Sequence, residues 1–363
     1  MTAAERLNTR LSELRETQAF RNYLDVRTHV LRFKDMEAPF GTATPSLYWQ
    51  EELAGFEYML DASPLVINKL LHHSYHLTGI KVYDYRTEKN EAQERFAEKL
   101  AALADLGGAD LLVPQPKVLG GFGFIIDGQI CNIDTLKFFE FLIGLKMADL
   151  LPLNSANGKT DRDRQCVLEI GAGWGGFAHA YKTIFPETTY AIIDLPEVLL
   201  FSGVYLKTLF PDARVYFYDP VEPIPEGGWS DYDFVLLPHT ALSDFNPDRL
   251  DLTLNMVSFQ EMTVDQCRGY VSKAHELGCP AIYSLNRDRG PYNPQMTAVP
   301  SIIAEFYNIE EVSVLDVPYT KMLPTGKKKS KPKEKSDLSY KHIAGRLANE
   351  PESGKSLLGH LFE

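Results

Sequence analysis

The pattern of hydrophobic and polar positions changes near residue 165 of this 363-residue chain. In residues 1–30, apolar positions such as Leu7, Leu11 and Leu14 recur at helical spacing, and helix-like stretches continue to about residue 105. From residue 165 onward, short aliphatic or β-branched runs alternate with amphipathic stretches. The first part is therefore expected to be helical, and the second to alternate between strands and helices.

Strands that alternate with helices predict an α/β fold with a doubly wound, mostly parallel sheet. The expected strands are the runs CVLEI, YAIID, ARVYFYD, DFVLLP, LDLTLNM and PAIYSLN. Helices are expected at 174–185, 196–210 and 263–277. Two strand candidates, 213–218 and 233–237, fall in one gap where a simple unit needs one strand. The sequence leaves open which of them is the extra element.

Composition narrows the classes of function. With 37 basic and 49 acidic residues, the formal net charge is −12, which disfavours general binding to nucleic acid or anionic membranes. Four cysteines lie far apart without a CxxC pair, which predicts reduced thiols in a cytoplasmic protein. The N-terminus lacks an apolar signal-peptide core, and charges interrupt the most apolar stretch, 136–153. Neither export nor membrane insertion is expected.

The sharpest motif is the glycine-rich turn in VLEIGAGWGGFAHA (167–180). An apolar strand runs into Gly171, Gly173 and Gly175, and a helix follows. Glycines allow a tight turn and let a cofactor approach the backbone, which a Cβ atom would obstruct. Asp194 ends the next strand, 21 residues after Gly173, where a carboxylate can accept hydrogen bonds from ribose hydroxyls.

Two cofactors fit this turn. Gly171-x-Gly173-x-x-Gly176 satisfies the dinucleotide fingerprint, so NAD is one candidate cofactor. A glycine-rich turn that binds no ligand is a further alternative. Glu169, two residues before the first glycine, favours S-adenosylmethionine (SAM) and a Rossmann-like methyltransferase fold, because E-x-G-x-G-x-G is typical of that class. Asp219, which ends a later strand, is expected either to bind the adenine amino group or to act as an ordinary strand-end cap. The expected cofactor residues are Glu169, Gly171, Ala172, Gly173, Gly175, Asp194, Leu195 and Asp219.

The acceptor is expected beyond the carboxyl ends of the later strands, where ligands bind in doubly wound sheets. Methyl transfer to a hydroxyl benefits from a base that takes its proton, and Glu261 and His239 are the candidates. A helix N-terminal charge at Glu261 and an ordinary loop histidine at His239 are the structural alternatives. Residues expected to bind the acceptor are His76, Asn255, Gln260 and Asn286.

Two upstream segments carry further expectations. LLHHSYHLTG (70–79) is interpreted as a polar lid or acceptor surface, with plain structural histidines as the alternative, since no acidic residue is adjacent to complete a metal site. Segment 120–142 predicts a hairpin and then a helix capped by Asn132 or Asp134. No metal ligands are assigned, and the sequence leaves open whether a divalent metal assists, because acidic residues show no diagnostic spacing.

These motifs together resemble the sugar O-methyltransferases of bacterial natural-product and glycan pathways. The resemblance rests on the glycine turn, DLPEV, NMVSFQEM, YSLNRDR, LGGFG with NIDTLKFFEFL, and HSYHLTG, and covers roughly residues 45–290. It implies SAM-dependent transfer to a hydroxyl of a sugar or glycoside. It also implies cofactor contacts at Glu169, Gly171, Gly173 and Asp194, and an active-site acid at Glu261.

Other interpretations stay open. The DLPEV turn also occurs in enzymes that methylate phenolic or polyketide hydroxyls, and a catalytically silent protein that scaffolds a pathway partner is a further alternative. Three parts are expected: a helical region over 1–160 for acceptor binding, a lid or oligomerisation; a SAM-binding domain over 161–325; and a basic linker and tail over 326–363. The run GKKKSKPKEK (326–335) predicts a solvated linker. A homo-oligomer is left open.

Overall fold

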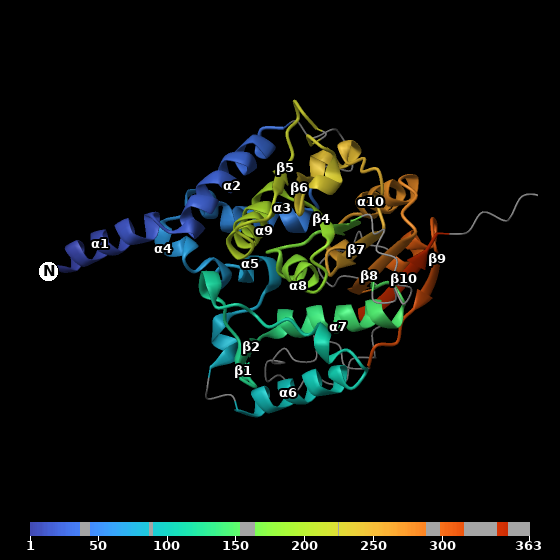
Figure 1. Cartoon of the computed structure of the whole chain (residues 1–363), viewed down its shortest axis with the longest axis horizontal. Helices are drawn as coiled ribbons and strands as arrows, with labels where there is room; N and C mark the ends of the chain where they lie inside the picture. The colour runs from blue at the N-terminus through green and yellow to red at the C-terminus, as the bar shows by residue number, and fades with distance from the viewer. Residues whose placement is uncertain are drawn as a thin grey trace, which may run out of the picture.

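An eight-stranded sheet forms the centre of the computed structural model (Figure 1). The model describes residues 1–36, 44–86, 90–152, 164–223, 225–287, 298–315 and 340–347. The strands are β3 (Gln165–Ile170), β4 (Thr188–Asp194), β5 (Val215–Phe217), β6 (Phe234–Pro238), β7 (Leu252–Met256), β8 (Ala281–Arg287), β9 (Asn308–Glu311) and β10 (Tyr340–Arg346). Their order is β5-β6-β4-β3-β7-β8-β10-β9, and all neighbours are parallel except β10, which runs antiparallel to both β8 and β9. The expected mostly parallel sheet is confirmed.

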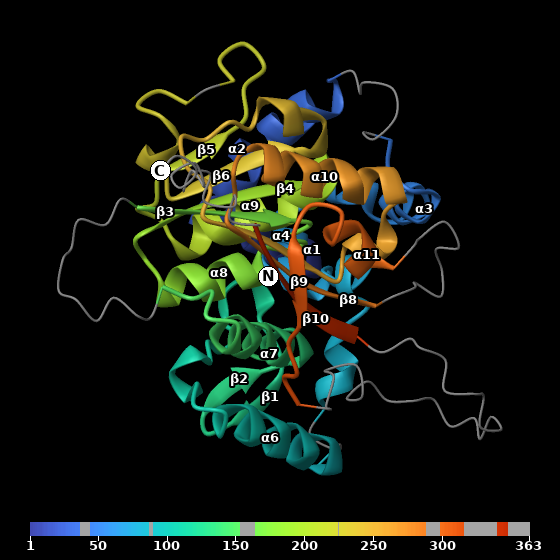
Figure 2. The ribbon, with the colours of Figure 1, turned by 90° about the vertical axis from the view of Figure 1, so that its right-hand side faces the viewer.

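Helices cover both faces of this sheet, as the doubly wound interpretation requires. Those that follow the strands are α8 (Gly176–Ile184), α9 (Pro196–Leu209), α10 (Val264–Glu276) and α11 (Val299–Ile303). Figure 2 shows α10 above the sheet and α8 below it. Two of these helices begin where the sequence predicts them. Pro196 occupies the first turn of α9, and the Thr263 side chain caps α10.

Both strand candidates of the sequence, 213–218 and 233–237, form strands, namely β5 and β6. β6 pairs with β4 and takes the inner position, whereas β5 pairs only with β6 and forms the edge of the sheet. The extra element is therefore β5. From β3 the chain first adds strands on one side, beginning with β4, and later adds β7 and β8 on the other side. The topological switch point therefore lies between β3 and β7.

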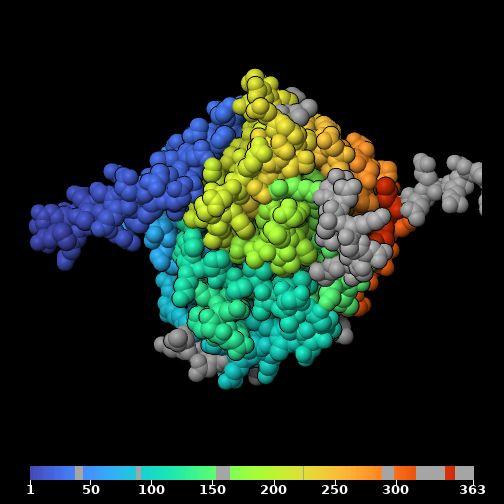
Figure 3. Space-filling model, in the orientation of Figure 1, coloured from blue at the N-terminus to red at the C-terminus, as the bar shows by residue number. Residues whose placement is uncertain are grey.

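The N-terminal region is helical, with one hairpin. Its α-helices are α1 (Ala3–Arg15), α2 (Gln18–Lys34), α3 (Leu47–Phe56), α4 (Pro64–Ile67), α5 (Tyr75–Thr78), α6 (Asn90–Ala104) and α7 (Ile133–Met147), and the hairpin is β1 (Phe124–Ile126) with β2 (Gln129–Cys131). Asn132 caps α7, as predicted, because its side chain accepts from the amide of Thr135. Helix α1 projects from the body of the molecule (Figure 3).

Short 3-10 helices connect several of these elements. They are η1 (Glu57–Asp61), η2 (Leu70–His72), η3 (Val82–Tyr85), η4 (Ala109–Leu111), η5 (Val118–Gly120), η6 (Trp229–Asp231), η7 (His239–Asp244) and η8 (Phe259–Glu261). Two of them follow strands closely: η7 begins directly after β6, and two residues separate η8 from the end of β7. They therefore begin at the carboxyl edge of the sheet.

Strand β10 corrects the expected boundary at residue 326. Tyr340–Arg346, assigned to the tail, instead lies inside the sheet between β8 and β9. Its close fit explains Gly345, where a Cβ atom would lie 2.7 Å from Cγ2 of Ile282 and 3.1 Å from Cγ2 of Ile303. His342 in the same strand contacts Glu140 of α7 at 3.1 Å, so β10 also contacts the helical region. The basic run 326–335 lies outside the described residues.

Candidate active site

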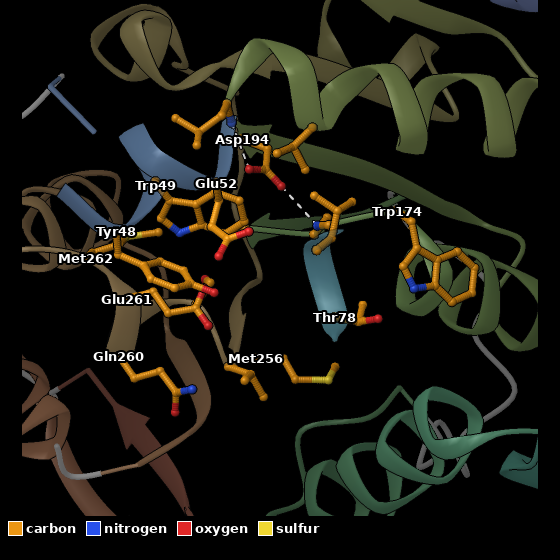
Figure 4. Close-up of a pocket in the computed structure, with 18 of the residues that line it drawn as sticks. Tyr48, Trp49, Glu52, Thr78, Trp174, Asp194, Met256, Gln260, Glu261 and Met262 are labelled. Atoms are coloured by element: carbon orange, nitrogen blue, oxygen red, sulfur yellow. Dashed lines mark hydrogen bonds between the residues drawn. The ribbon is translucent and has the colours of Figure 1, made fainter. Parts of the chain in front are cut away.

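A cavity of about 410 Å³ opens at the carboxyl ends of β3, β4, β7 and β8. This is the edge of the switch point between β3 and β7, where doubly wound sheets bind their ligands. Helices α3 and α5 of the N-terminal region complete the wall, and Tyr48, Trp49 and Glu52 of α3 point into the space (Figure 4). The cavity thus lies between the two expected parts of the chain.

The glycine turn forms one side of this cavity. Gly171 and Gly173 have φ angles of 74° and 59°, in the left-handed region that favours glycine. A Cβ atom on Gly171 would lie 2.2 Å from the Ser258 hydroxyl, so this glycine permits close packing against the loop after β7. A Cβ atom on Gly173 would meet nothing within 4 Å. The backbone at Gly173 is therefore open to a ligand.

Asp194 at the end of β4 closes the turn from the other side. Its carboxylate accepts from the Gly173 amide at 3.0 Å and from its neighbour Leu195 at 2.8 Å (Figure 4). Burial raises the pKa of Asp194 to about 7, although these amides oppose the shift. Ala172 and Leu195 also line the cavity. A half-buried carboxylate beside an open backbone is suited to bind the hydroxyls of a ribose.

Glu169 lies beneath the turn, with only 2% of its surface exposed. The Tyr190 hydroxyl donates to its carboxylate at 2.9 Å. Burial raises the pKa of Glu169 to about 8, with Tyr190 partly opposing the shift. The group therefore retains its proton near neutral pH, and a cation that entered the cavity would favour its charged form.

The loop after β7 is held by a buried polar network. Asn255 donates to the Ile170 carbonyl at 2.9 Å and accepts from Asn286 at 2.7 Å. Ser258 also donates to the Ile170 carbonyl, at 3.0 Å. Val257 has a φ of 62°, a strained value for a β-branched residue. Asn255 and Asn286, expected to bind the acceptor, do not line the cavity and instead position this loop.

The network presents Glu261 to the cavity. The Ser46 hydroxyl donates to the Glu261 carbonyl at 2.6 Å, and Trp49 donates to its carboxylate. Burial raises the pKa of Glu261 to about 8, partly opposed by the charge of Lys137 and increased by that of Glu52. Glu261 and Glu52 point into the same space in Figure 4. A carboxylate with this pKa can take a proton near neutral pH.

Of the remaining residues expected in the site, some line the cavity and others do not. His239 begins η7 directly after β6 and lines the cavity, as do Gln260 and His76. Gly175 does not line it, because this residue caps α8 and packs against Ser202. Asp219, expected to bind the adenine amino group, follows the edge strand β5, lies outside the cavity and pairs with Arg32 at 2.9 Å.

Several residues that line the cavity were not predicted from the sequence. Trp49 and Glu52 reach the site only through the packing of α3 over the sheet, and Lys137 through the packing of α7. Arg287 could have been identified, because it directly follows the predicted strand PAIYSLN and lies at the same edge of the sheet as Glu261. Among the described residues, no group of three His, Cys, Asp or Glu side chains could hold a metal ion. No helix within the described ranges is long and apolar enough to span a bilayer.

Comparison with known proteins gives distant structural likenesses. No protein-family model and no curated protein matches the chain. The pyocyanin biosynthetic protein PhzM shares 12% identity over 57% of this chain and 57% of its own, with a TM-score of 0.34. WbdD shares 11% identity over 59% of this chain and 39% of its own, with a TM-score of 0.36. The N-methyltransferase NodS from Bradyrhizobium japonicum WM9, in complex with S-adenosyl-L-homocysteine, shares 13% identity over 51% and 79%, with a TM-score of 0.30.

This chain therefore covers little more than half of PhzM and less than half of WbdD. At such low identities and TM-scores, these likenesses carry no functional argument. The function of the chain is therefore inferred from the chemistry of its cavity.

Proposed function

We propose that this protein is a SAM-dependent O-methyltransferase that methylates a hydroxyl of a sugar or glycosylated metabolite. The observation that carries the proposal is the arrangement at the carboxyl edge of the sheet. Asp194 and the open backbone of Gly173 lie on one side of the cavity, and Glu261 lies on the other. The first pair is suited to a nucleoside, and the second position is suited to a base.

The charge of the cavity supports SAM over NAD. Four carboxyl groups line it, from Glu52, Glu169, Asp194 and Glu261, against the cations of Lys137 and Arg287. A sulfonium cation would favour the charged forms of Glu169 and Asp194 and be attracted to them, whereas an anionic pyrophosphate would gain no attraction from either group. Gly171, Ala172, Gly173 and Leu195 would hold the cofactor together with these two acids. When bound, SAM supplies an activated methyl group on its sulfonium.

Glu261 would act on the acceptor. Its carboxylate takes the proton of the acceptor hydroxyl as the oxygen forms its bond to the methyl carbon, and the electron pair of the broken C–S bond stays on sulfur. Trp49 and the polar network under η8 hold the carboxylate in place. His239, at the end of β6, is the alternative base. His76 and Gln260, which also line the cavity, would contact the acceptor.

The test separates cofactor from acceptor. Calorimetry with SAM, S-adenosylhomocysteine and NAD is expected to show binding of the first two only. Labelled SAM would then be offered with nucleotide sugars, glycosylated natural products and simple phenols, and products gaining one methyl group identified by mass spectrometry.

Each result has a defined meaning. Transfer to phenols alone would replace the sugar assignment. Binding of S-adenosylhomocysteine without transfer to any acceptor would favour the scaffold alternative, and preferential binding of NAD would overturn the proposal.

A further inference from the structure

Arg287 is a cation in the cavity that forms no ion pair with a carboxylate of the described residues. It ends β8, and its charge acts on the Glu261 carboxyl, whose pKa it lowers against the larger effect of burial. Its Nε is buried and without a hydrogen-bond partner. Lys137, in contrast, pairs with Asp134 at 2.8 Å. A buried guanidinium donor without an acceptor is costly unless a ligand provides one.

The guanidinium is held in a fixed orientation. It lies over the ring of Tyr340, 4.6 Å from the centroid, so strand β10 provides a flat platform for it. The backbone amide of Arg287 donates to the Gln260 side chain at 2.9 Å, and the Gln260 amide lies 3.5 Å from the Tyr340 hydroxyl. The ring of Tyr340 supports the guanidinium, and the Gln260 contacts hold that ring and the end of β8 together, which reduces the entropy lost when a ligand binds.

Arg287 lies on the acceptor side of the cavity. Along the carboxyl edge, Asp194 follows β4, the glycine turn follows β3, Glu261 follows β7 and Arg287 ends β8. Three strand spacings separate β4 from β8, or about 14 Å at about 4.8 Å each. Glu261 thus lies between Arg287 and the proposed nucleoside site. Figure 4 agrees, because Gln260, the hydrogen-bond partner of the Arg287 amide, lies on the opposite side of Glu261 from Asp194.

We propose that Arg287, on its Tyr340 platform, binds an anionic group of the acceptor, so that the acceptor is an acidic sugar. A planar guanidinium matches a carboxylate or a phosphate through two parallel hydrogen bonds. The anion could be a sugar carboxylate or a phosphate ester. Bound there, it would place a neighbouring hydroxyl beside Glu261. The inference rests on the proposed function and specifies its substrate class.

The experiment compares acceptors that differ in charge. Glucuronic acid, glucose 1-phosphate and glucose would be tested at about 1 mM by calorimetry with the S-adenosylhomocysteine-bound protein, and by methyl transfer from labelled SAM. The wild-type protein is expected to bind at least one acidic probe and to bind glucose more weakly. Glucuronic acid and glucose 1-phosphate distinguish the two sources of the anion.

Two variants assign the effect to the guanidinium. Arg287→Gln should weaken binding of the acidic probe by about 10- to 100-fold, the range for a hydrogen bond to a charged group, and leave glucose unchanged. Arg287→Lys should lie between them, since it retains the charge without the planar fork. Arg268→Gln, which breaks an exposed ion pair with Glu305, is the matched control and should match wild type.

The outcomes separate this inference from the proposed function. Failure of S-adenosylhomocysteine to bind the wild-type protein would refute the proposed function. If it binds, but no acidic probe binds better than glucose, the acidic acceptor is refuted alone. Weaker binding of S-adenosylhomocysteine to Arg287→Gln would instead assign Arg287 to the amino-acid carboxylate of the cofactor and overturn the inference.

Discussion

Asp194 combines two roles at the scale of a single residue, because one carboxylate accepts from the glycine turn and faces the cavity. We predict that Asp194→Ala weakens binding of S-adenosylhomocysteine by about 1–3 kcal/mol, the range for hydrogen bonds to a charged group. Calorimetry measures this loss, and thermal unfolding checks that the variant folds. Glu305→Gln, on the exposed surface, is the control. Unchanged affinity in folded Asp194→Ala would remove Asp194 from the cofactor site.

Glu261 is expected to contribute as a general base. Replacement by Gln retains its size and removes its basicity, so kcat should fall by about 10²–10⁴-fold while cofactor affinity is retained. His239→Gln tests the alternative base in the same assay. If both variants remain within a few-fold of wild type, neither residue is the base, and catalysis would rest on the orientation of the two substrates.

The raised pKa of Glu261 predicts the pH profile of the wild-type enzyme. A base works only when deprotonated, so kcat/KM should rise with pH and level off above about 8. A bound sulfonium favours the carboxylate, so the corresponding midpoint in kcat should be lower. Stopped assays from pH 5.5 to 9 would measure both. A profile that retains this limb in Glu261→Gln would assign the titration to another group.

The places of the glycine turn, Glu169 and Asp194 in the cavity were predictable because they depend on local spacing after two neighbouring strands. The same strand-end logic did not place Asp219, which lies outside the cavity because β5 is an edge strand separated from β4 by β6. Trp49 and Glu52 were not predictable. Their place in the cavity depends on how α3 packs against a loop more than 200 residues later, through contacts such as Ser46 with Glu261.

At the scale of elements, the strands and helices from 165 to 287 follow the predicted pattern closely, because each carries a strong apolar run and a distinct turn. The strand β10 was missed for a physical reason. It is buried on both faces, so its side chains do not alternate, and its small residues Ala344 and Gly345 fit between neighbours rather than form an apolar face.

The place of β10 predicts how truncation affects folding. Removal of residues 316–363 deletes the partner of both β8 and β9. The melting temperature should fall by about 10 °C or more, or the cooperative transition should be lost. Removal of 348–363 alone leaves β10 and both of its pairings in place and should lower the melting temperature much less. Circular dichroism would measure both. Equal stability of the two truncations would show that β10 is dispensable.

At the scale of the whole molecule, three carboxyl groups share one cavity and have raised pKa values: about 8 for Glu169 and Glu261, and about 7 for Asp194. The folded protein therefore holds protons that the unfolded chain has released, and stability falls as pH rises toward 8. Five histidines whose pKa values are lowered by burial, His29, His72, His73, His76 and His179, act in the opposite direction near pH 6.5, because the unfolded chain still binds protons on them. Comparison with a variant that lacks one carboxyl group therefore isolates the carboxyl effect.

We predict that each of the three carboxyl groups lowers the unfolding free energy of the ligand-free protein by about 1 kcal/mol between pH 6.5 and 8, partly offset by the histidines. Glu169→Gln retains an acceptor for the Tyr190 hydroxyl and removes one titration, so its loss should be smaller. Urea unfolding at several pH values would measure the slope. A slope identical to wild type in Glu169→Gln would mean that Glu169 is charged in the folded protein.

The antiparallel β10 also has a consequence for the time course of synthesis. Strand β9 and the free edge of β8 both acquire their partner only when β10 leaves the ribosome. Residues 312–339, a stretch of 28, separate β9 from β10, which at about 5–20 residues per second takes roughly one to six seconds to translate. During that interval the nascent chain exposes an apolar strand edge that can pair with other chains. Chaperone binding to stalled nascent chains should therefore be greatest when translation has passed β9 and has not yet released β10.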